Sequence, residues 1–456
     1  ATAGRCRFGL VGPPAGGSVR LIMQASPKSN IDPSAKIGQP GAWVPAQLLV
    51  RRLLRPVERF IAIEAASGIV LLATAVLALA WANSPWSASY TALWHTPIGL
   101  NVAGFRFERD LHFWINDGLM TIFFFVVGLE IRREIHQGEL SELRRAALPL
   151  VAALGGMVVP AAIFIGLNQG QPTIRGWGIP MATDIAFAVG VLALLGRRVP
   201  PALRVLLLAL AVIDDVGAIL VIAIFYSTGI DFLGFVIAGG GIAAIVVLQL
   251  FGARSAITYI IPALIVWAGV YRAGVHPTLA GVAVGFLTPV RTWANETVSP
   301  VDALQQQFHG TVAYAIMPLF ALANAGVPLA GVAISGSGVM LFAGITLGLV
   351  AGKTIGIAGA SWIAAQLRIT LLPRGVRWSG VLVVGLVGGI GFTMSLFVAG
   401  LAFPAGPTLE TAKLAVLVAS GTAAVGGLAL GRAVLPREIE QGAARTAYEA
   451  ETSTDA

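Results

Sequence analysis

Long apolar runs separated by short loops constrain this chain more than any other feature of its sequence. A helix needs about 20 mostly apolar residues to cross the hydrocarbon core of a bilayer. Runs that reach or approach this length lie at 61–82, 112–131, 147–168, 178–195, 203–226, 232–251, 256–271, 276–289, 309–325, 339–364, 380–403 and 411–431. We therefore predict an all-α polytopic membrane protein with about twelve transmembrane helices.

The composition agrees with this class of protein. Hydrophobic residues make up 56% of the chain and charged residues only 11%, whereas a soluble domain is about 25% charged. The single cysteine, Cys6, excludes an intrachain disulfide framework and a cysteine-based metal cluster.

The basic residues indicate topology rather than nucleic-acid binding, despite the net charge of +8. When the connections are numbered alternately, those of one face and both chain ends carry Arg51, Arg52, Arg55, Arg59, Arg132, Arg133, Arg144, Arg145, Arg197, Arg198, Arg204, Arg254, Arg291, Arg368, Arg374, Arg377, Arg432 and Arg437. The opposite face carries only Arg106, Arg109, Arg175, Arg272 and Lys413. This bias predicts that both termini are cytoplasmic and that the number of spans is even.

Three regions follow from these patterns. Residues 1–50 are rich in Gly, Pro, Ser and basic residues, and their apolar stretches are too short for the core of a signal peptide. We expect them to form a disordered cytoplasmic extension, followed by a transmembrane domain at 51–436 and a cytoplasmic tail at 437–456.

The longest loop on the face opposite the termini is 83–111. Within it, "IGLNVAGFRFERDL" alternates apolar and polar residues around an Ala-Gly pair, which predicts a small external β-hairpin. A simple polar loop is the alternative. An exposed hairpin edge is able to pair with a second copy of itself.

Ionisable residues within apolar runs are rare, energetically costly and usually functional. We single out six of them, namely Asp117, Glu130, Asp184, Asp214, Asp215 and Lys353. A structural ion pair or a helix cap is the alternative interpretation, because buried ion pairs also occur without a transport role.

Asp214 and Asp215 are adjacent in "LALAVIDDVGAIL". Neighbours on a helix point about 100° apart, so the two carboxylates cannot bind one group in the same way. Lys353 is the only basic residue deep within a span and is the natural partner of one of them. The other aspartate is then left to hold a cation or a proton. Glu130, by contrast, is expected to form an interfacial network with Arg133 and Glu134, which lie three and four residues further along the same helix.

Two segments are poor candidates for continuous helices. "GWGIPMATDIAFAVG" carries Gly and Pro just before Thr183 and Asp184, and "VGLVGGIGFTMSLFVAG" carries four glycines. Paired interrupted segments in the two halves of a chain indicate a transport site between inverted repeats; a close-packing glycine face is the alternative. Broken helices leave charged half-helix ends, which Asp184 is able to neutralise at the N-termini and Lys353 at the C-termini.

Seven segments together resemble the NhaA family of bacterial sodium/proton antiporters. They are "FFFVVGLEIRREIHQGEL", "GWGIPMATDIAFAVGVLALLGRRVP", "LALAVIDDVGAILVIAIFY", "GVHPTLAGVAVGF", "MPLFALANAGV", "AGKTIGI" and "GGIGFTMSLFVAGLAF". The resemblance covers roughly residues 57–435. It implies inverted repeats, with two broken helices that cross at the middle of the membrane.

The resemblance also implies roles for the matching residues of the ion site. Asp215 matches the principal ligand of Na⁺ or Li⁺ and a proton carrier. Asp214 matches its neighbour, which pairs with the lysine that corresponds to Lys353. Asp184 matches the residue that balances half-helix charge, and Thr183 the residue that contributes an oxygen to the cation.

Further roles implied by the resemblance concern regulation and assembly. Glu130, Arg133 and Glu134 match a cytoplasmic cluster linked to pH activation, to which we add Asp117 as a regulatory candidate. The hairpin at 97–109 matches the contact of a homodimer. Gln305 departs from the family pattern, because family members can carry a glutamate there, and this departure places the usual pH activation in question.

These features lead us to expect a secondary antiporter that expels Na⁺ or Li⁺ in exchange for protons, is electrogenic and regulated by pH, and serves Na⁺ and pH homeostasis in the bacterial inner membrane. No GxxxxGK[ST] pattern for a nucleotide-driven pump is present in the sequence. We expect no enzymatic activity, no cofactor and no nucleic-acid partner. His276 and His309 are expected to be interfacial rather than pH-sensing residues.

Three other classes of protein use similar residues. A retinal photoreceptor needs one buried lysine with an aspartate counter-ion but has fewer spans. An intramembrane aspartyl protease needs two aspartates that face each other from separate helices. A proton-coupled symporter of an organic solute needs a larger polar site than the apolar runs supply.

Overall fold

The computed structural model describes residues 65–435, apart from 103–104, 228, 230, 293–297, 333–334 and 374. The expected extension at 1–50 and the expected tail at 437–456 lie outside the described residues, as do the ends of the expected domain at 51–64 and 436. These boundaries therefore stay predictions.

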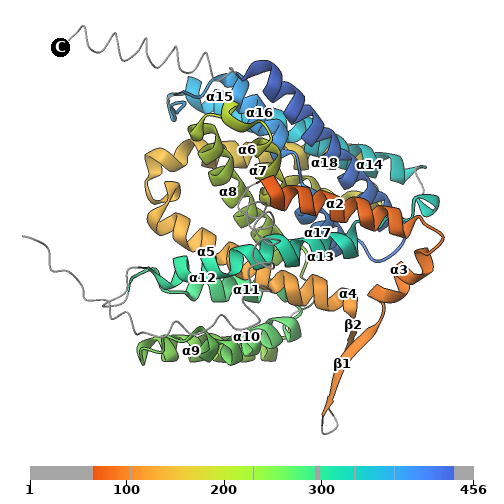
Figure 1. The fold of residues 1–456 in the computed structure, drawn as a ribbon, viewed down its shortest axis with the longest axis vertical. Coiled ribbons are helices and arrows are strands. Elements are labelled where there is room, and N and C mark those ends of the chain that lie inside the picture. Colours follow the sequence, from red (N-terminus) through yellow and green to blue (C-terminus); the bar gives the residue numbers. More distant parts are fainter. Residues whose placement is uncertain are drawn as a thin grey trace, which may run out of the picture. The chain divides into compact units, whose positions relative to one another are not determined.

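The described chain is mainly helical, with one pair of strands (Figure 1). In chain order, the helices and strands are α2 (Ala65–Ala82), α3 (Ser87–Trp94), β1 (Pro97–Val102), β2 (Phe105–Asp110), α4 (Leu111–Phe113), η1 (Trp114–Leu119), α5 (Met120–Gln137), η2 (Glu139–Ser141), α6 (Leu143–Asn168), η3 (Pro172–Met181), α7 (Ile185–Ala193), η4 (Gly196–Arg198), α8 (Pro201–Phe225), α9 (Phe232–Leu250), η5 (Ala256–Tyr259), α10 (Ile260–Arg272), α11 (Thr278–Leu287), α12 (Pro300–Thr311), η6 (Val312–Ile316), α13 (Met317–Asn324), η7 (Leu329–Gly331), α14 (Ser337–Leu347), η8 (Gly348–Gly352), α15 (Lys353–Gln366), α16 (Trp378–Gly388), α17 (Phe392–Ala402) and α18 (Pro407–Val434).

Six helices in the described part of the chain are long and apolar enough to cross a membrane. They are Leu111–Gln137, Arg145–Asn168, Pro201–Phe225, Phe232–Leu250, Ser337–Gln366 and Pro407–Val434. The number rises to nine if each of three bent helix pairs counts as one span. Many large apolar side chains remain exposed, Phe251 and Leu371 among them, and such a surface suits contact with lipid tails.

The described parts of the twelve apolar runs are mostly helical, but twelve spans are not confirmed. Two of the runs form helices of only 10 to 17 residues, Ala256–Arg272 and Thr278–Leu287. The run at 309–325 is divided among α12, η6 and α13. Hydropathy finds apolar segments but does not measure how far one straight helix extends, so the count of about twelve stays a prediction.

The β-hairpin is confirmed. β1 and β2 pair antiparallel, with Pro97 opposite Asp110 and Val102 opposite Phe105. The two strands extend away from the helices (Figure 1). The side chain of Arg109 ties β2 to α10, because its Nη2 donates to the hydroxyl of Tyr271 at 2.5 Å. This hydrogen bond also raises the pKa of Arg109 further above its ordinary value.

Two of the bent pairs are the segments that the sequence predicted to be broken. η3 and α7 meet at 47°, and α16 and α17 meet at 45°. The third pair, Ala66–Ala82 with Ser87–Trp94, turns by 114° and was not predicted.

The two breaks touch each other. The backbone N–H of Asp184, in the first break, donates to the carbonyl of Ile390, in the second, at 2.7 Å. Glycine also lets the second break fit among its neighbours: a Cβ added at Gly389 would lie 2.3 Å from the carbonyl oxygen of Leu349 in η8, and one at Gly391 would lie 2.1 Å from Ser395 Oγ in α17. The inverted repeat itself stays a prediction.

Candidate functional site

The adjacent carboxylates lie in the middle of α8, which runs from Pro201 to Phe225. Both Asp214 and Asp215 are buried, and α8 packs against α5, α6 and α16. A charged group so far from water needs a partner of opposite charge or several hydrogen bonds. The two aspartates meet this requirement in different ways.

Asp214 is held by a lysine and a threonine. Its Oδ2 accepts from Lys353 Nζ, which is itself buried at the start of α15, directly after the π-helical turn η8. The hydroxyl of Thr183, in the first break, lies 2.7 Å from the same oxygen and accepts from Lys353 Nζ at 2.9 Å. A charge-assisted triad thus joins α8, α15 and the first break.

The hydroxyl hydrogen of Thr183 has a second acceptor within reach. The carbonyl of Gly388, at the C-terminal end of α16, lies 2.8 Å from Thr183 Oγ1. The positive charge of Lys353 reaches this half-helix end through Thr183, whose hydroxyl oxygen accepts from Lys353 Nζ. The expected compensation of the C-terminal end therefore runs through Thr183.

Asp184 lies at the N-termini of both short half-helices. Its Oδ1 accepts from the N–H of Phe187 in α7 at 3.0 Å. Its Oδ2 accepts from the N–H of Thr393 in α17 at 3.1 Å and also from the hydroxyl of Thr393. A carboxylate in this position accepts from N–H groups that have no partner within the first turn of a helix. Its negative charge also compensates the positive N-terminal ends of both helices.

Asp215 has no such set of partners. Its Oδ1 is buried and has no hydrogen-bond partner among the described residues. Its charge interacts electrostatically with Glu130 in α5, with Asp184 and Asp214, and with Lys353. Asp214 Oδ1 is also buried and without a hydrogen-bond partner, so within the described part of the chain each carboxylate has one unused, buried oxygen, and Asp214 alone of the two is paired with Lys353.

The expected regulatory residues do not form a single group. Arg133 lies at the end of α5 and bonds across to α12, with its Nε 3.4 Å from Asp302 Oδ1 and its Nη1 3.1 Å from Gln305 Oε1. Glu130 interacts electrostatically with Arg133 and Glu134 as well as with Asp215. Its charge is therefore coupled both to the end of α5 and to the expected ion site.

Asp117 lies apart from that group. It sits in the π-helical segment η1, and its Oδ1 is 3.3 Å from Nε2 of His276. The imidazole of His276 is also 2.9 Å from the hydroxyl of Thr278 and contacts the ring of Phe397 in α17. The sequence did not predict the pairing of His276 with Asp117. The other histidine considered, His309, is exposed on α12.

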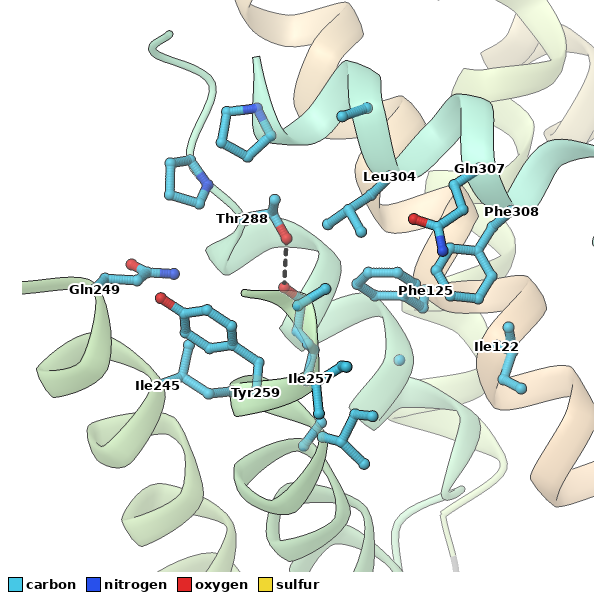
Figure 2. A pocket seen from close by; sticks show the side chains of 18 of the residues that line it. Ile122, Phe125, Ile245, Gln249, Ile257, Tyr259, Thr288, Leu304, Gln307 and Phe308 are labelled. Atoms are coloured by element: carbon cyan, nitrogen blue, oxygen red, sulfur yellow. Dashed lines mark hydrogen bonds between the residues drawn. The ribbon is translucent and has the colours of Figure 1, made fainter. Parts of the chain in front are cut away.

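A large cavity lies away from these residues, between α5 and α9 to α12 (Figure 2). Its volume is about 570 Å³, and its walls are mostly apolar, with polar groups from Gln249, Tyr259, Thr288 and Gln307. None of the expected ion-site residues lines it. The residues of the expected ion site are instead all buried.

The chain matches the family model described as Na⁺/H⁺ antiporter 1 over residues 58–430. The chain belongs to this family. Its similarity to individual members of the family is high and extends over nearly their whole length. It is 55% identical to Na⁺/H⁺ antiporter NhaA 2 of Sorangium cellulosum, over 91% of this chain and 98% of that protein.

Two further relatives support the assignment. Na⁺/H⁺ antiporter NhaA 2 of Myxococcus xanthus is 52% identical over 91% of this chain and 97% of its own length. Na⁺/H⁺ antiporter NhaA of a Janthinobacterium species is 49% identical over 86% of this chain and 96% of its own length. The resemblance recognised in the seven sequence segments is therefore confirmed, and the chain is a multi-pass bacterial membrane protein of an antiporter family.

Two residues of the site were not found from the sequence. Thr393 bonds Asp184 twice, and Ser420 accepts from the N–H of Phe392, at the start of α17. The "GFTMS" segment was recognised for its glycines, and a threonine just after a predicted break was the available signal for Thr393. Ser420 lies in an ordinary apolar helix that gave no such signal.

Proposed function

We propose that this chain exchanges cytoplasmic Na⁺ or Li⁺ for external protons, and that Asp215 and Asp214 are the residues at which the two ions compete. The observation that carries the proposal is the pair of buried oxygens, Asp215 Oδ1 and Asp214 Oδ1, that have no hydrogen-bond partner among the described residues, while Lys353 pairs with Asp214. Hard cations prefer oxygen ligands, and a buried carboxylate that lacks an ion pair and several hydrogen bonds is stabilised by binding a proton or a cation.

The exchange follows from competition at a site that opens to one side at a time. A proton that arrives from outside displaces Na⁺ from Asp215, and Na⁺ that arrives from inside displaces the proton. The proton gradient then drives sodium export. More than one proton per sodium ion makes the cycle electrogenic, and the Asp214–Lys353 pair carries the second proton. Lys353 Nζ loses this proton to the solvent as the pair opens and becomes neutral, and the Asp214 carboxylate, no longer paired, becomes a ligand of Na⁺.

The remaining site residues hold this arrangement in place. Thr183 supplies a hydroxyl oxygen next to Asp214, and Asp184 keeps the two half-helix N-termini together. Glu130 interacts electrostatically with Arg133 and Glu134 and also with Asp215, so its charge state influences the site. This is our basis for regulation by pH, and Asp117 with His276 forms a second regulatory candidate.

The setting of the exchange is also part of the proposal. We place the protein in the inner membrane with both termini in the cytoplasm, because the basic residues are concentrated in the connections of one face. We further propose a homodimer that forms through the hairpin, whose strands extend away from the helices (Figure 1).

The test uses inside-out vesicles with an acid interior and a pH-sensitive dye. We expect Na⁺ and Li⁺, but not K⁺, to dissipate the proton gradient with the native chain, and Asp215→Asn to abolish this response. Asp231→Asn is the matched control, since Asp231 is a half-exposed carboxylate that pairs with Arg272 outside the site. A correctly inserted native chain that responds to no cation between about pH 6 and pH 9 would contradict the proposal.

A further inference from the structure

The start of α17 is held by a residue from outside the broken pair. Ser420 lies near the middle of α18, is buried, and accepts from the backbone N–H of Phe392 at 3.0 Å. Helix α18 packs against both halves of the second broken span, α16 and α17. The serine hydroxyl therefore meets the chain at the point where the helix restarts after its break.

The first turn of a helix has N–H groups without partners inside the helix. In α17, the N–H of Thr393 is satisfied by Asp184 Oδ2, and that of Phe392 by Ser420 Oγ. Asp184 is already committed on its other oxygen to the N–H of Phe187 in α7. Asp184 thus accepts from the first turns of two helices, while Ser420 accepts from the remaining donor, the N–H of Phe392.

An unbroken chain of buried contacts links Ser420 to the ion-binding carboxylates. It passes from Ser420 to Phe392, through the adjacent Thr393 to Asp184, and through the adjacent Thr183 to Asp214. The side chains of Ser420, Thr393, Asp184 and Thr183 are all buried. A shift at one end has little free space in which to be absorbed.

We propose that Ser420 is a positioning residue for ion exchange: its hydroxyl fixes the N-terminus of α17 and thereby sets the placement of Asp184 and Thr183 beside Asp214. The inference rests on the proposed function. Without the hydroxyl, the N–H groups of Phe392 and Thr393 compete for Asp184 Oδ2, and the carboxylate is drawn toward α17. Burying the N–H of Phe392 without a partner costs free energy, so we expect the backbone at the start of α17 to shift.

The test is Ser420→Ala, compared with the native chain in inside-out vesicles over a series of Na⁺ concentrations and pH values. Loss of a capping side chain of this kind changes an equilibrium constant by about three- to tenfold. We expect the Na⁺ concentration for half-maximal response to rise by about this factor at each pH. The maximal response and the amount of inserted protein change less.

Two variants separate positioning from simple destabilisation. Thr422→Ala removes a hydroxyl from the same helix, but one that is exposed and bonded to the carbonyl of Val418 in its own helix. We expect this variant to behave as the native chain. Ser420→Thr keeps the acceptor and is expected to restore the native Na⁺ dependence, while Ser420→Cys, with a weaker acceptor, is expected to lie between serine and alanine.

The outcomes distinguish this inference from the proposed function. If the native chain exchanges Na⁺ and Ser420→Ala has the native half-maximal concentration, the inference is wrong and the proposed function stands. The same holds if Ser420→Ala and Thr422→Ala shift it equally. If the native chain itself shows no exchange, the proposed function fails, and the positioning role fails with it. Should Ser420→Ala not insert, the Thr and Cys variants give the comparison.

Discussion

Two charged regions of this molecule have similar residues but opposite surroundings. At the crossing of the broken segments, Asp184, Asp214 and Lys353 are buried, and hydrogen bonds from three or more helices hold them. At the α5–α12 contact, Arg133 bridges Asp302 and Gln305, but its side chain is 51% exposed. The buried charges of the first region depend on their partners for stability, whereas the charges of the second region are screened by water.

The difference teaches where a substitution has its effect. A buried ion pair contributes little net stability relative to an apolar pair, but removing one partner leaves an uncompensated charge. An exposed ion pair is worth about 0 to 1 kcal/mol. We therefore expect large effects on stability and transport at the crossing, and effects mainly on regulation at the α5–α12 contact.

The largest expected effect is that of Lys353→Met. It leaves Asp214 buried without its charged partner, at a cost of about 3 to 5 kcal/mol. We expect the melting temperature of the purified protein to fall by on the order of 10 °C, and Na⁺-dependent proton release to be lost.

A second substitution checks the cause. Asp214→Leu combined with Lys353→Met removes both charges, so thermal stability is expected to recover in part while transport stays absent. A double variant as unstable as the sum of the single ones would show that Lys353 and Asp214 do not act as a pair.

A smaller effect is expected for Asp184→Asn. The amide keeps one acceptor oxygen, but its NH₂ group then faces either the N–H of Phe187 or the donors of Thr393. One buried donor loses its acceptor, which costs about 1 to 3 kcal/mol. We expect the melting temperature to fall by less than with Lys353→Met, and the exchange rate in vesicles to fall by about tenfold.

The conservative comparison is Asp302→Asn, which makes the same chemical change at the α5–α12 contact. Its carboxylate bonds Arg133 and the hydroxyl of Ser299 near the surface. We expect no more than a small loss of stability there. Equal losses at Asp184 and Asp302 would contradict the contrast between the two regions.

The sequence predicted the crossing better than it predicted the contact. Lys353 is the only basic residue deep in a span, so its pairing with an aspartate followed from cost alone. Glycines marked both breaks and a proline marked the first, because those residues disfavour continuous helices. Which aspartate takes the lysine was not deducible from the residues themselves, since it depends on how α8 is rotated against α15.

Contacts between distant segments without unusual residues were missed. Arg133 and Gln305 are 172 positions apart, and Phe392 and Ser420 are 28 apart. The residues involved are ordinary for their helices, and only tertiary packing brings them together. The pairing of Asp117 with His276 was missed for the same reason, although each had been noted separately. Helix lengths also depend on packing, which is why the number of spans was not confirmed.

The smallest expected effect on stability, and the sharpest test of the second region, is that of Gln305→Glu. The new carboxylate lies where Gln305 Oε1 is now 3.1 Å from Arg133 Nη1, and it forms a partly exposed ion pair. We expect the melting temperature to change by about 2 °C at most. The pH of half-maximal exchange is expected to rise by a fraction of a unit, because an added negative charge favours proton binding at Glu130 and its neighbours.

The control for this shift is Gln306→Glu, which adds the same charge one position along α12, at an exposed residue. Choline chloride, which supplies ionic strength without Na⁺, is a second control: at about 0.5 M it reduces a shift that is purely electrostatic. If Gln306→Glu moves the pH profile as far as Gln305→Glu does, the contact with Arg133 has no regulatory role. If only Gln305→Glu moves it, and salt reduces the movement, the exposed region sets the pH at which the buried region works.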